Sequence, residues 1–171
     1  MPFQLFEEPI EMNVTCEIAW KHRPIDGGSN PDYSREHRWS FDGGAVIDAS
    51  SSPDIVPAPM SNPAHVDPEE AILAAAASCH MLFFLHLATA SGFQVHAYAD
   101  APTAVLGHDD DGALALTSIC LCPEVAFEGA PPSAEEMLGL HEMAHDRCFI
   151  AKSMRTPITI DIPLRRSRSV A

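Results

Sequence analysis

The chain has 171 residues, of which 46% are hydrophobic and 20% are charged. This is the composition of a soluble globular protein that is long enough to bury a core. Its 24 acidic residues outnumber its 10 lysines and arginines, and the net charge of −14 repels phosphate backbones and anionic lipid surfaces. We therefore expect one domain over residues 1–171 that binds neither nucleic acid nor membranes, with the basic segment 165–171 as a solvated tail.

The N-terminal segment MPFQLFEEPIEMN lacks the cationic region, the apolar run and the small-residue cleavage site of a secretory signal. Five cysteines, at positions 16, 79, 120, 122 and 148, cannot all pair within one chain. An odd number of thiols favours a reducing compartment over a disulfide framework. We expect a cytoplasmic protein.

The first third of the chain has the pattern of strands. Residues 13–20 (NVTCEIAW) alternate between the two faces of a strand. Residues 34–41 (SREHRWSF) and 45–50 (AVIDAS) predict two more strands, which the sequence DGG joins as a hairpin. The segment 51–66 is rich in proline and serine and predicts a long surface loop.

A helix is predicted over residues 67–91. Asp67 can cap its first turn, Pro68 suits the first helical position, and Glu70 completes a capping box. Gly92 is placed for a left-handed C-terminal cap. The helix is apolar all round and long enough to span a bilayer, but its polar residues and the lack of basic flanks favour a buried core helix.

Residues 93–101 and 113–127 predict strands around the exposed turn GHDDDG at 107–112. Within the second of them, Pro123 indicates a bulge, an edge or an end, because proline cannot donate a ladder hydrogen bond.

A second capping box, at Ser133 and Glu136, predicts a helix over residues 133–153. The alternating segment PITIDIP at 157–163 predicts a final strand. Strands, a long helix, more strands, a helix and a last strand together favour an α+β fold in which helices pack on antiparallel sheet.

The cysteines fall into two groups. Cys16, Cys120 and Cys122 lie in strand patterns and are interpreted as small, inert hydrophobes. The Cys-x-Cys pair places both thiols on one face of a strand, which is poor geometry for a four-ligand metal site without a second pair. Cys79 and Cys148 are instead predicted to lie within helices, beside titratable side chains.

The segment HEMAHDRC places His141, His145 and Cys148 on one helical face. Three interpretations are compatible with this pattern: a metal site with Cys79 as an outside ligand, a reactive thiol flanked by imidazoles, or partly exposed histidines on an amphipathic helix. The residue types alone leave all three open.

The segment DPEEAILAAAASCHMLFFLHLA, followed further along by HEMAHDRCFIAKSM, resembles the OsmC/Ohr family of thiol-dependent organic hydroperoxide reductases. The segment YSREHRWSF resembles the strand that carries the family's arginine. The resemblance runs from about residue 14 to 162 and is closest to a subgroup with Ser-Cys-His-Met-Leu at the first cysteine. It implies an OsmC-like α+β fold with antiparallel sheets wrapped around two helices in an intertwined homodimer.

By position, the resemblance implies that Cys79 is the peroxidatic cysteine and Cys148 the resolving cysteine. Glu69 matches the glutamate of the family motif, and Arg35 matches the arginine, with Arg38 as the alternative. The implied activity is reduction of an organic hydroperoxide through a Cys79 sulfenic acid and a Cys79–Cys148 disulfide, which an external dithiol reduces. No metal or organic cofactor is expected.

The geometry of a helix restricts these roles. Ten residues of straight helix separate Glu69 from Cys79 by about 15 Å, so the two cannot share one arginine within a chain unless the helix is broken. We expect Glu69 to serve the cysteine of the partner chain in a homodimer.

The substrate pocket is expected to include His80, Phe83, Phe84 and Phe149, and the aromatic rings favour an organic peroxide. Phe149 stands where well-characterised members have proline, and Asp67 replaces the usual asparagine before Pro-Glu. These departures leave an alternative: an OsmC-fold protein without peroxidase activity that binds a small ligand, or a metal through His141, His145, Cys148 and Cys79.

Overall fold

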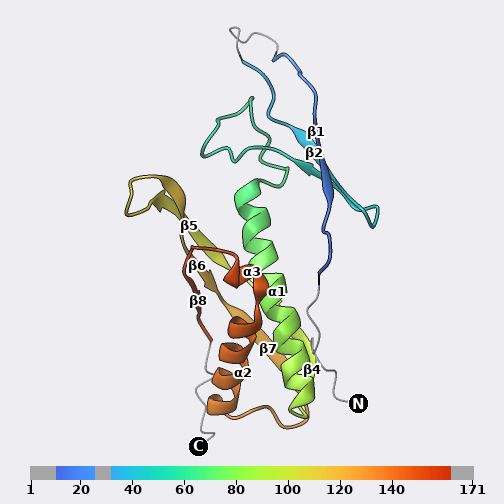
Figure 1. The fold of residues 1–171 in the computed structure, drawn as a ribbon, viewed down its shortest axis with the longest axis vertical. Coiled ribbons are helices and arrows are strands. Elements are labelled where there is room, and N and C mark those ends of the chain that lie inside the picture. The colour runs from blue at the N-terminus through green and yellow to red at the C-terminus, as the bar shows by residue number, and fades with distance from the viewer. Residues whose placement is uncertain (1–10, 26–31, 163–171) are drawn as a thin grey trace, which may run out of the picture. The chain divides into compact units, whose positions relative to one another are not determined.

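The computed structural model describes residues 11–25 and 32–162 (Figure 1). Contacts within the chain divide these residues into two compact units, residues 11–72 and 73–162. The single domain expected from the sequence therefore comprises two units, and each is described by itself. The predicted basic tail and the N-terminal segment tested for a secretory signal lie outside the described residues, apart from the last three residues of that segment.

The unit of residues 11–72 is built on an antiparallel sheet of β1 (Cys16–Trp20), β2 (His37–Phe41) and β3 (Val46–Ala49). The three predicted strands are confirmed, each somewhat shorter than its pattern. The hairpin between β2 and β3 turns through Gly44, whose φ of +85° suits glycine.

The predicted loop over 51–66 is also confirmed, and hydrogen bonds hold it to the sheet. The backbone N–H of Arg35 donates to the Met60 carbonyl at 2.7 Å. The Asn62 side-chain amide donates to the Glu36 carboxylate at 2.6 Å, and this bond is the largest cause of the lowered pKa of Glu36. The loop is therefore part of the packed unit.

Helix α1 spans Pro68–Ala90 without a break. Its predicted capping box is present: the Glu70 N–H donates to the Asp67 carboxylate at 2.8 Å, and the Asp67 N–H donates to the Glu70 carboxylate at 3.1 Å. The helix ends before Gly92, which has the left-handed φ of +86°. By length and composition alone α1 is able to cross a membrane, a test that core helices of soluble proteins also pass.

The unit of residues 73–162 contains two sheets. Strand β4 (Gln94–Asp100) pairs antiparallel with β7 (Pro123–Glu128). The other sheet has the order β5-β6-β8, from β5 (Thr103–His108), β6 (Leu114–Leu121) and β8 (Ile158–Ile160).

The structure corrects the predicted strands of this unit in three ways. The single strand predicted over 113–127 is two strands in different sheets, because the chain leaves the β5–β6 ladder at Cys122, immediately before Pro123. Strand β5 was not predicted, and β8 runs parallel to β6 although an antiparallel sheet was expected. The sequence of a strand does not show whether the neighbouring strand runs parallel or antiparallel to it.

The second predicted helix is also divided. Helix α2 (Ala134–Arg147) starts at the predicted capping box, where the Glu136 N–H donates to Ser133 Oγ at 3.3 Å. It ends at Cys148, whose ψ of 103° is extended, and a short helix α3 (Phe149–Lys152) follows. The prediction that Cys148 lies within a helix is therefore wrong.

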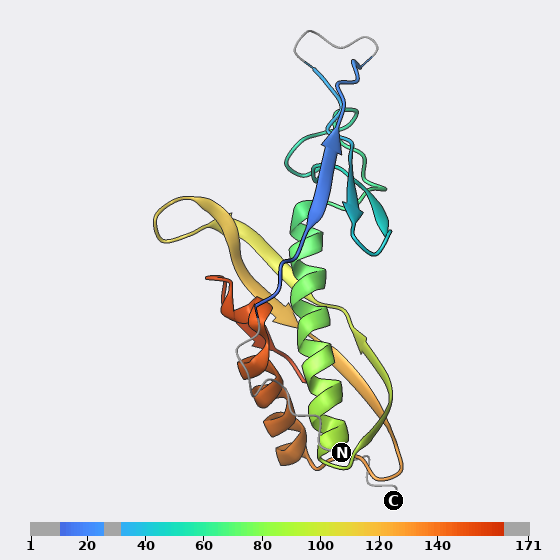
Figure 2. The ribbon, with the colours of Figure 1, turned by 45° about the vertical axis from the view of Figure 1, so that its right-hand side comes forward.

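In this unit α2 lies alongside the C-terminal half of α1, as Figures 1 and 2 both show. Ala77 of α1 packs with Ile119 and Leu121 of β6 in one buried cluster. Phe84 and Leu140 are also buried. The α1–α2 interface carries most of the side chains that the sequence marked for chemistry.

Candidate active site

The structure brings together the two cysteines that the family resemblance pairs. Cys79 lies on α1 and is 7% exposed, and Cys148 lies at the α2–α3 junction and is 1% exposed. Both are free thiols, and Cys79 lies near enough to act on the Cys148 thiol. Burial first, and then the neighbouring Cys79 thiol, raises the pKa of Cys148 to about 11, so its thiol is protonated at neutral pH.

The break between α2 and α3 positions the second thiol. Cys148 ends one helix and begins the next, and its Sγ accepts a hydrogen bond from the Ala151 N–H at 3.4 Å. The sulfur therefore takes the place of a capping side chain. In a continuous helix, Cys148 would lie on the face of α2 that helical periodicity gives it. The extended backbone at Cys148 instead determines the direction of its side chain.

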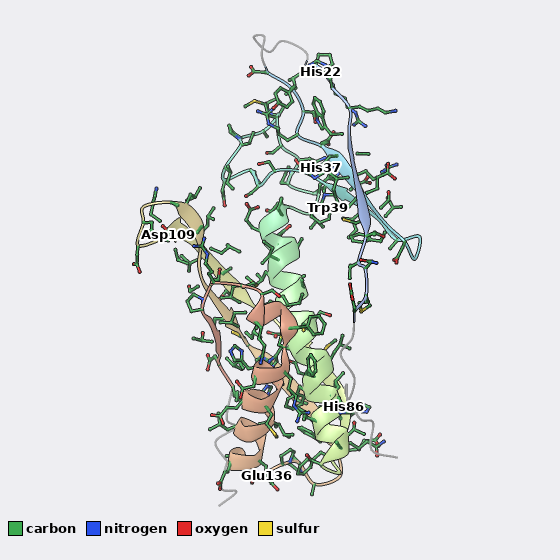
Figure 3. The ribbon with its side chains drawn as sticks, viewed as in Figure 1. His22, His37, Trp39, His86, Asp109 and Glu136 are labelled. Atoms are coloured by element: carbon green, nitrogen blue, oxygen red, sulfur yellow. The ribbon has the colours of Figure 1, made fainter. Side chains whose placement is uncertain are left out.

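Arg35 and Glu69 line one cavity in the unit of residues 11–72. Its volume is about 480 Å³, and Figure 3 labels His37 of β2, which forms part of its wall. The guanidinium of Arg35 stacks 3.5 Å above the centroid of the Tyr33 ring and donates from Nη1 to the Tyr33 carbonyl at 2.8 Å. The remaining lining residues are Trp20, Ser50, Ser51, Ile55 and Pro68.

Arg35 and Glu69 form no ion pair with each other in the part of the chain that the structure describes. The Glu69 Oε2 atom is buried and has no hydrogen-bond partner in the part of the chain that the structure describes. Arg38, the alternative arginine, instead forms an ion pair with Asp48 at 3.1 Å, in which both side chains are exposed. Arg35, rather than Arg38, therefore shares a cavity with Glu69, whose buried oxygen is left for another donor.

Two histidines expected to bind substrate or metal contact each other instead. His80 Nε2 and His141 Nδ1 are 3.0 Å apart across the α1–α2 interface, the rings are parallel, and each residue is 1% exposed. Burial lowers the pKa of each imidazole to about 4, so both are neutral at neutral pH. Phe84 stacks on His141 with ring centroids 4.3 Å apart.

The metal alternative receives no support from this arrangement. Among the described residues, no group of three or more His, Cys, Asp or Glu side chains is placed to hold a metal ion. His141 is engaged with His80, and His145, one turn further along α2, is only partly buried.

The predicted aromatic residues occupy two different environments. Phe84 is fully buried between Tyr98 and His141, so it is a core residue. Phe83 is 8% exposed and meets Phe149 edge to face at 5.9 Å, while Phe149 itself is 58% exposed. These two rings lie on the segments that carry Cys79 and Cys148.

The sequence reasoning missed Tyr33 and Trp20, the aromatic walls beside Arg35. Trp20 Nε1 donates to the Ser34 carbonyl at 2.9 Å, and its ring meets the Tyr33 ring edge to face. A signal was present: Tyr33 opens the YSREHRWSF segment, and Trp20 ends the alternating run of β1. An arginine beside strand aromatics is a candidate for stacking.

The α+β fold and the neighbouring buried thiols agree with the resemblance found in the sequence. A comparison with family models identifies the family. The family model described as OsmC-like protein matches residues 61–163, and the chain belongs to this family. The expected OsmC-like α+β fold, with several antiparallel sheets and two main helices, is confirmed. No protein of curated function matches the chain.

Three solved structures are similar to the chain. An OsmC-like protein of unknown function from Vibrio cholerae is 39% identical, with a TM-score of 0.85 over 89% of this chain and 99% of that one. An organic hydroperoxide resistance protein from Elizabethkingia anophelis is 15% identical, with a TM-score of 0.65 over 91% and 96%. Another, from Bacillus subtilis, is 19% identical, with a TM-score of 0.61 over 86% and 97%. The latter two show a shared fold alone.

Proposed function

We propose that this protein is a thiol-dependent peroxidase that reduces organic hydroperoxides with Cys79 and Cys148. The observation that carries the proposal is the proximity of two buried free thiols, one on α1 and one at the α2–α3 junction. Each is the residue that the family motifs select, although they lie far apart in the sequence. The Ser-Cys-His-Met-Leu subgroup is the branch of the family to which we assign the chain.

In the proposed reaction, the Cys79 thiolate attacks the distal oxygen of the hydroperoxide. The O–O bond breaks, Cys79 becomes a sulfenic acid, and the alkoxide takes a proton and leaves as an alcohol. The Cys148 sulfur then attacks the sulfenic sulfur, so that a disulfide forms and water leaves. An external dithiol, available in the cytoplasm, reduces this disulfide and is itself oxidised to a disulfide. No metal or organic cofactor takes part.

The protonation of Cys148 supports this division of roles. A thiol with a pKa of about 11 is a poor nucleophile toward peroxide at neutral pH, because the thiolate is the reactive form. A sulfenic acid formed at Cys79 would place an electrophile beside it. Cys148 is therefore poorly suited to the first attack, which we assign to Cys79.

Arg35 and Glu69 are proposed to complete the site from the partner subunit of a homodimer. Helix α1 is continuous, so about 15 Å of helix separates Glu69 from Cys79 of the same chain. The buried, unpartnered Glu69 oxygen is suited to hold a guanidinium, and a guanidinium beside a thiol favours the thiolate. Arg35 lines the same cavity and is the arginine we assign to this role.

The substrate is proposed to be an organic hydroperoxide. Phe83 and Phe149 form an aromatic pair on the segments that bear the two cysteines, and aromatic surface favours an apolar substituent over hydrogen peroxide. Phe149 is the position at which this chain departs from the proline of well-characterised members, so it is where substrate preference is expected to differ.

The test is mass spectrometry of the reduced protein after one equivalent of cumene hydroperoxide at pH 7. We expect rapid loss of two thiols and a Cys79–Cys148 disulfide in the mapped peptides. Cys148→Ser is expected to accumulate a sulfenic acid that dimedone traps, and Cys79→Ser is expected to stay reduced. Cys16→Ser, at an exposed thiol of the other unit, is the matched control and is expected to behave as the unsubstituted protein.

If the thiols of the unsubstituted protein stay reduced, the proposed peroxidase activity is contradicted. The alternative, a family member that binds a small ligand without turnover, would then be the working proposal. Oxidation at Cys16 or Cys120 with Cys79 intact would equally contradict the assigned roles.

A further inference from the structure

A second pair of thiols lies in the unit of residues 73–162 and takes no part in the proposed peroxidase chemistry. Cys120 is the penultimate residue of β6, and Cys122 follows the strand directly. Their Sγ atoms are 3.9 Å apart, and both are free and half-buried. From the sequence each was interpreted as an inert hydrophobe on one face of a strand, and the structure places their sulfurs in contact.

The backbone around these thiols is fixed by its neighbours. The Cys122 N–H, in the link between β6 and β7, donates to Asp100 Oδ1 on β4 at 2.8 Å. Pro123 follows, and a residue before proline is restricted to extended conformations. The backbone that carries Cys122 is therefore held before any ligand arrives, which lowers the entropy cost of binding one.

The surroundings of the pair are acidic. Asp100 and Asp161 both lie close enough to act electrostatically on the Cys122 thiol. The second oxygen of Asp100, Oδ2, is buried and has no hydrogen-bond partner in the described part of the chain. A negative environment of this kind disfavours two adjacent thiolates and anionic oxidants, and it favours a cation between the sulfurs.

We propose that Cys120 and Cys122 form a two-sulfur binding site for monovalent copper. Thiolate ligands select soft cations, of which Cu(I) needs only two sulfur ligands. Zinc prefers four ligands, and no group of three metal-binding side chains exists among the described residues. On binding, two S–H bonds break, two Cu–S bonds form and two protons pass to solvent, without any change of oxidation state.

The observed spacing suits a shared ion. Two thiolates that hold one ion in line, at a metal–sulfur distance of about 2.3 Å, lie about 4.6 Å apart. The Cys120 and Cys122 sulfurs are 3.9 Å apart, so they have to part by about 0.7 Å, which a small rotation of the side chains supplies.

The test is an anaerobic titration with Cu(I) in competition with the coloured bicinchoninate complex. The background is the Cys79→Ser/Cys148→Ser protein, which lacks the other thiol pair. We expect one Cu(I) per chain, and an affinity lower by about 100-fold or more when Cys120→Ser or Cys122→Ser is added. Cys16→Ser in the same background is the control and is expected to leave the affinity unchanged.

Alkylation gives a second measurement that needs no substitution at the site. Bound Cu(I) is expected to slow the reaction of Cys120 and Cys122 with iodoacetamide in the background protein, and to leave Cys16 reactive. This result stands even if a site variant fails to fold, which circular dichroism would reveal. The proposal is overturned if the background protein takes no copper from the competitor, or if binding and protection are the same without these two thiols.

Discussion

The buried imidazole pair makes the stability of the fold depend on pH between neutrality and about pH 4. His80 and His141 share one hydrogen bond at 3.0 Å, and their outer ring nitrogens have no partner among the described residues. Burial is the largest cause that lowers the pKa of each from 6.5 to about 4. The unfolded chain therefore binds more protons than the folded chain throughout this range.

The sign and size follow from these values. At pH 7 both imidazoles are neutral in the folded state, and nearly so in the unfolded state. At pH 5 the unfolded imidazoles are mostly protonated while the folded pair stays neutral, which costs about 2 kcal/mol per histidine, or about 4 kcal/mol for the pair. Stability contributed by the pair is thus complete above about pH 6.5 and is lost as the pH falls toward 4.

The assay is urea unfolding at pH 7 and at pH 5, at one protein concentration, followed by circular dichroism. The His80→Leu/His141→Met variant replaces both imidazoles by apolar groups and leaves no half of the pair unsatisfied. Its loss of unfolding free energy between the two pH values is expected to be smaller than that of the unsubstituted protein by about 4 kcal/mol.

Carboxylates that titrate near pH 5 contribute to both proteins and cancel in the comparison. The matched control is His108→Gln, at an exposed histidine of β5, and its pH dependence is expected to follow the unsubstituted protein. Equal losses in the double variant and the unsubstituted protein would refute the reasoning that burial holds these two imidazoles neutral.

Three further outcomes are expected. Arg35→Lys is expected to lower kcat/KM for cumene hydroperoxide by about 10-fold or more, because lysine lacks the planar fork of the guanidinium. The control Arg38→Lys is expected to leave kcat/KM within about two-fold, and equal effects would contradict the assignment of Arg35 as the active-site arginine. Because the pKa of Cys148 is about 11, only about one thousandth of this thiol is ionised at pH 8. Its reaction with iodoacetamide is expected to be far slower than that of a cysteine in an unstructured peptide, and to accelerate as the pH approaches 11. Asn62→Ala is expected to lower the free energy of unfolding, measured in urea, by about 1 to 2 kcal/mol, because it removes the shortest hydrogen bond to the Glu36 carboxylate. An unchanged urea midpoint would show that this bond does not hold the loop of residues 51–66.

Signals confined to a few neighbouring residues predicted structure best. Both capping boxes, at Asp67–Glu70 and Ser133–Glu136, are present with the expected reciprocal hydrogen bonds. Gly92 has the left-handed backbone conformation that its position required. In each case the partners lie within one turn of each other, so the sequence contains the whole interaction.

Two features of the candidate site escaped prediction. Helical periodicity continues through Cys148, but the chain turns there so that its sulfur meets the Ala151 N–H. The pairing of His80 with His141 crosses 61 positions of sequence, and neither residue alone indicates the other. Each of these histidines was therefore assigned to a ligand or a substrate, whereas the structure uses them to join α1 to α2.

The candidate site residues come from a motif, and the structure describes their surroundings. Family resemblance selected Cys79 and Cys148 together, a choice that periodicity alone could not make. It left Arg35 and Arg38 undecided because the two are only three residues apart, just before and within β2. The difference between them lies in their surroundings: Tyr33 holds one guanidinium over a cavity, and Asp48 holds the other on the surface.

Helix α1 links the chemistry to the assembly that we propose. A helix that is apolar all round is expected to be buried on every side. Within this chain, however, Leu82 is 60% exposed and Ile72 is 43% exposed. A second copy that covers these side chains would remove apolar surface from water, and in our proposal it also brings the Arg35–Glu69 cavity to Cys79. The same contact would then stabilise the dimer and complete the active site, so a folded monomer would retain its thiol pair but lack the arginine that activates it.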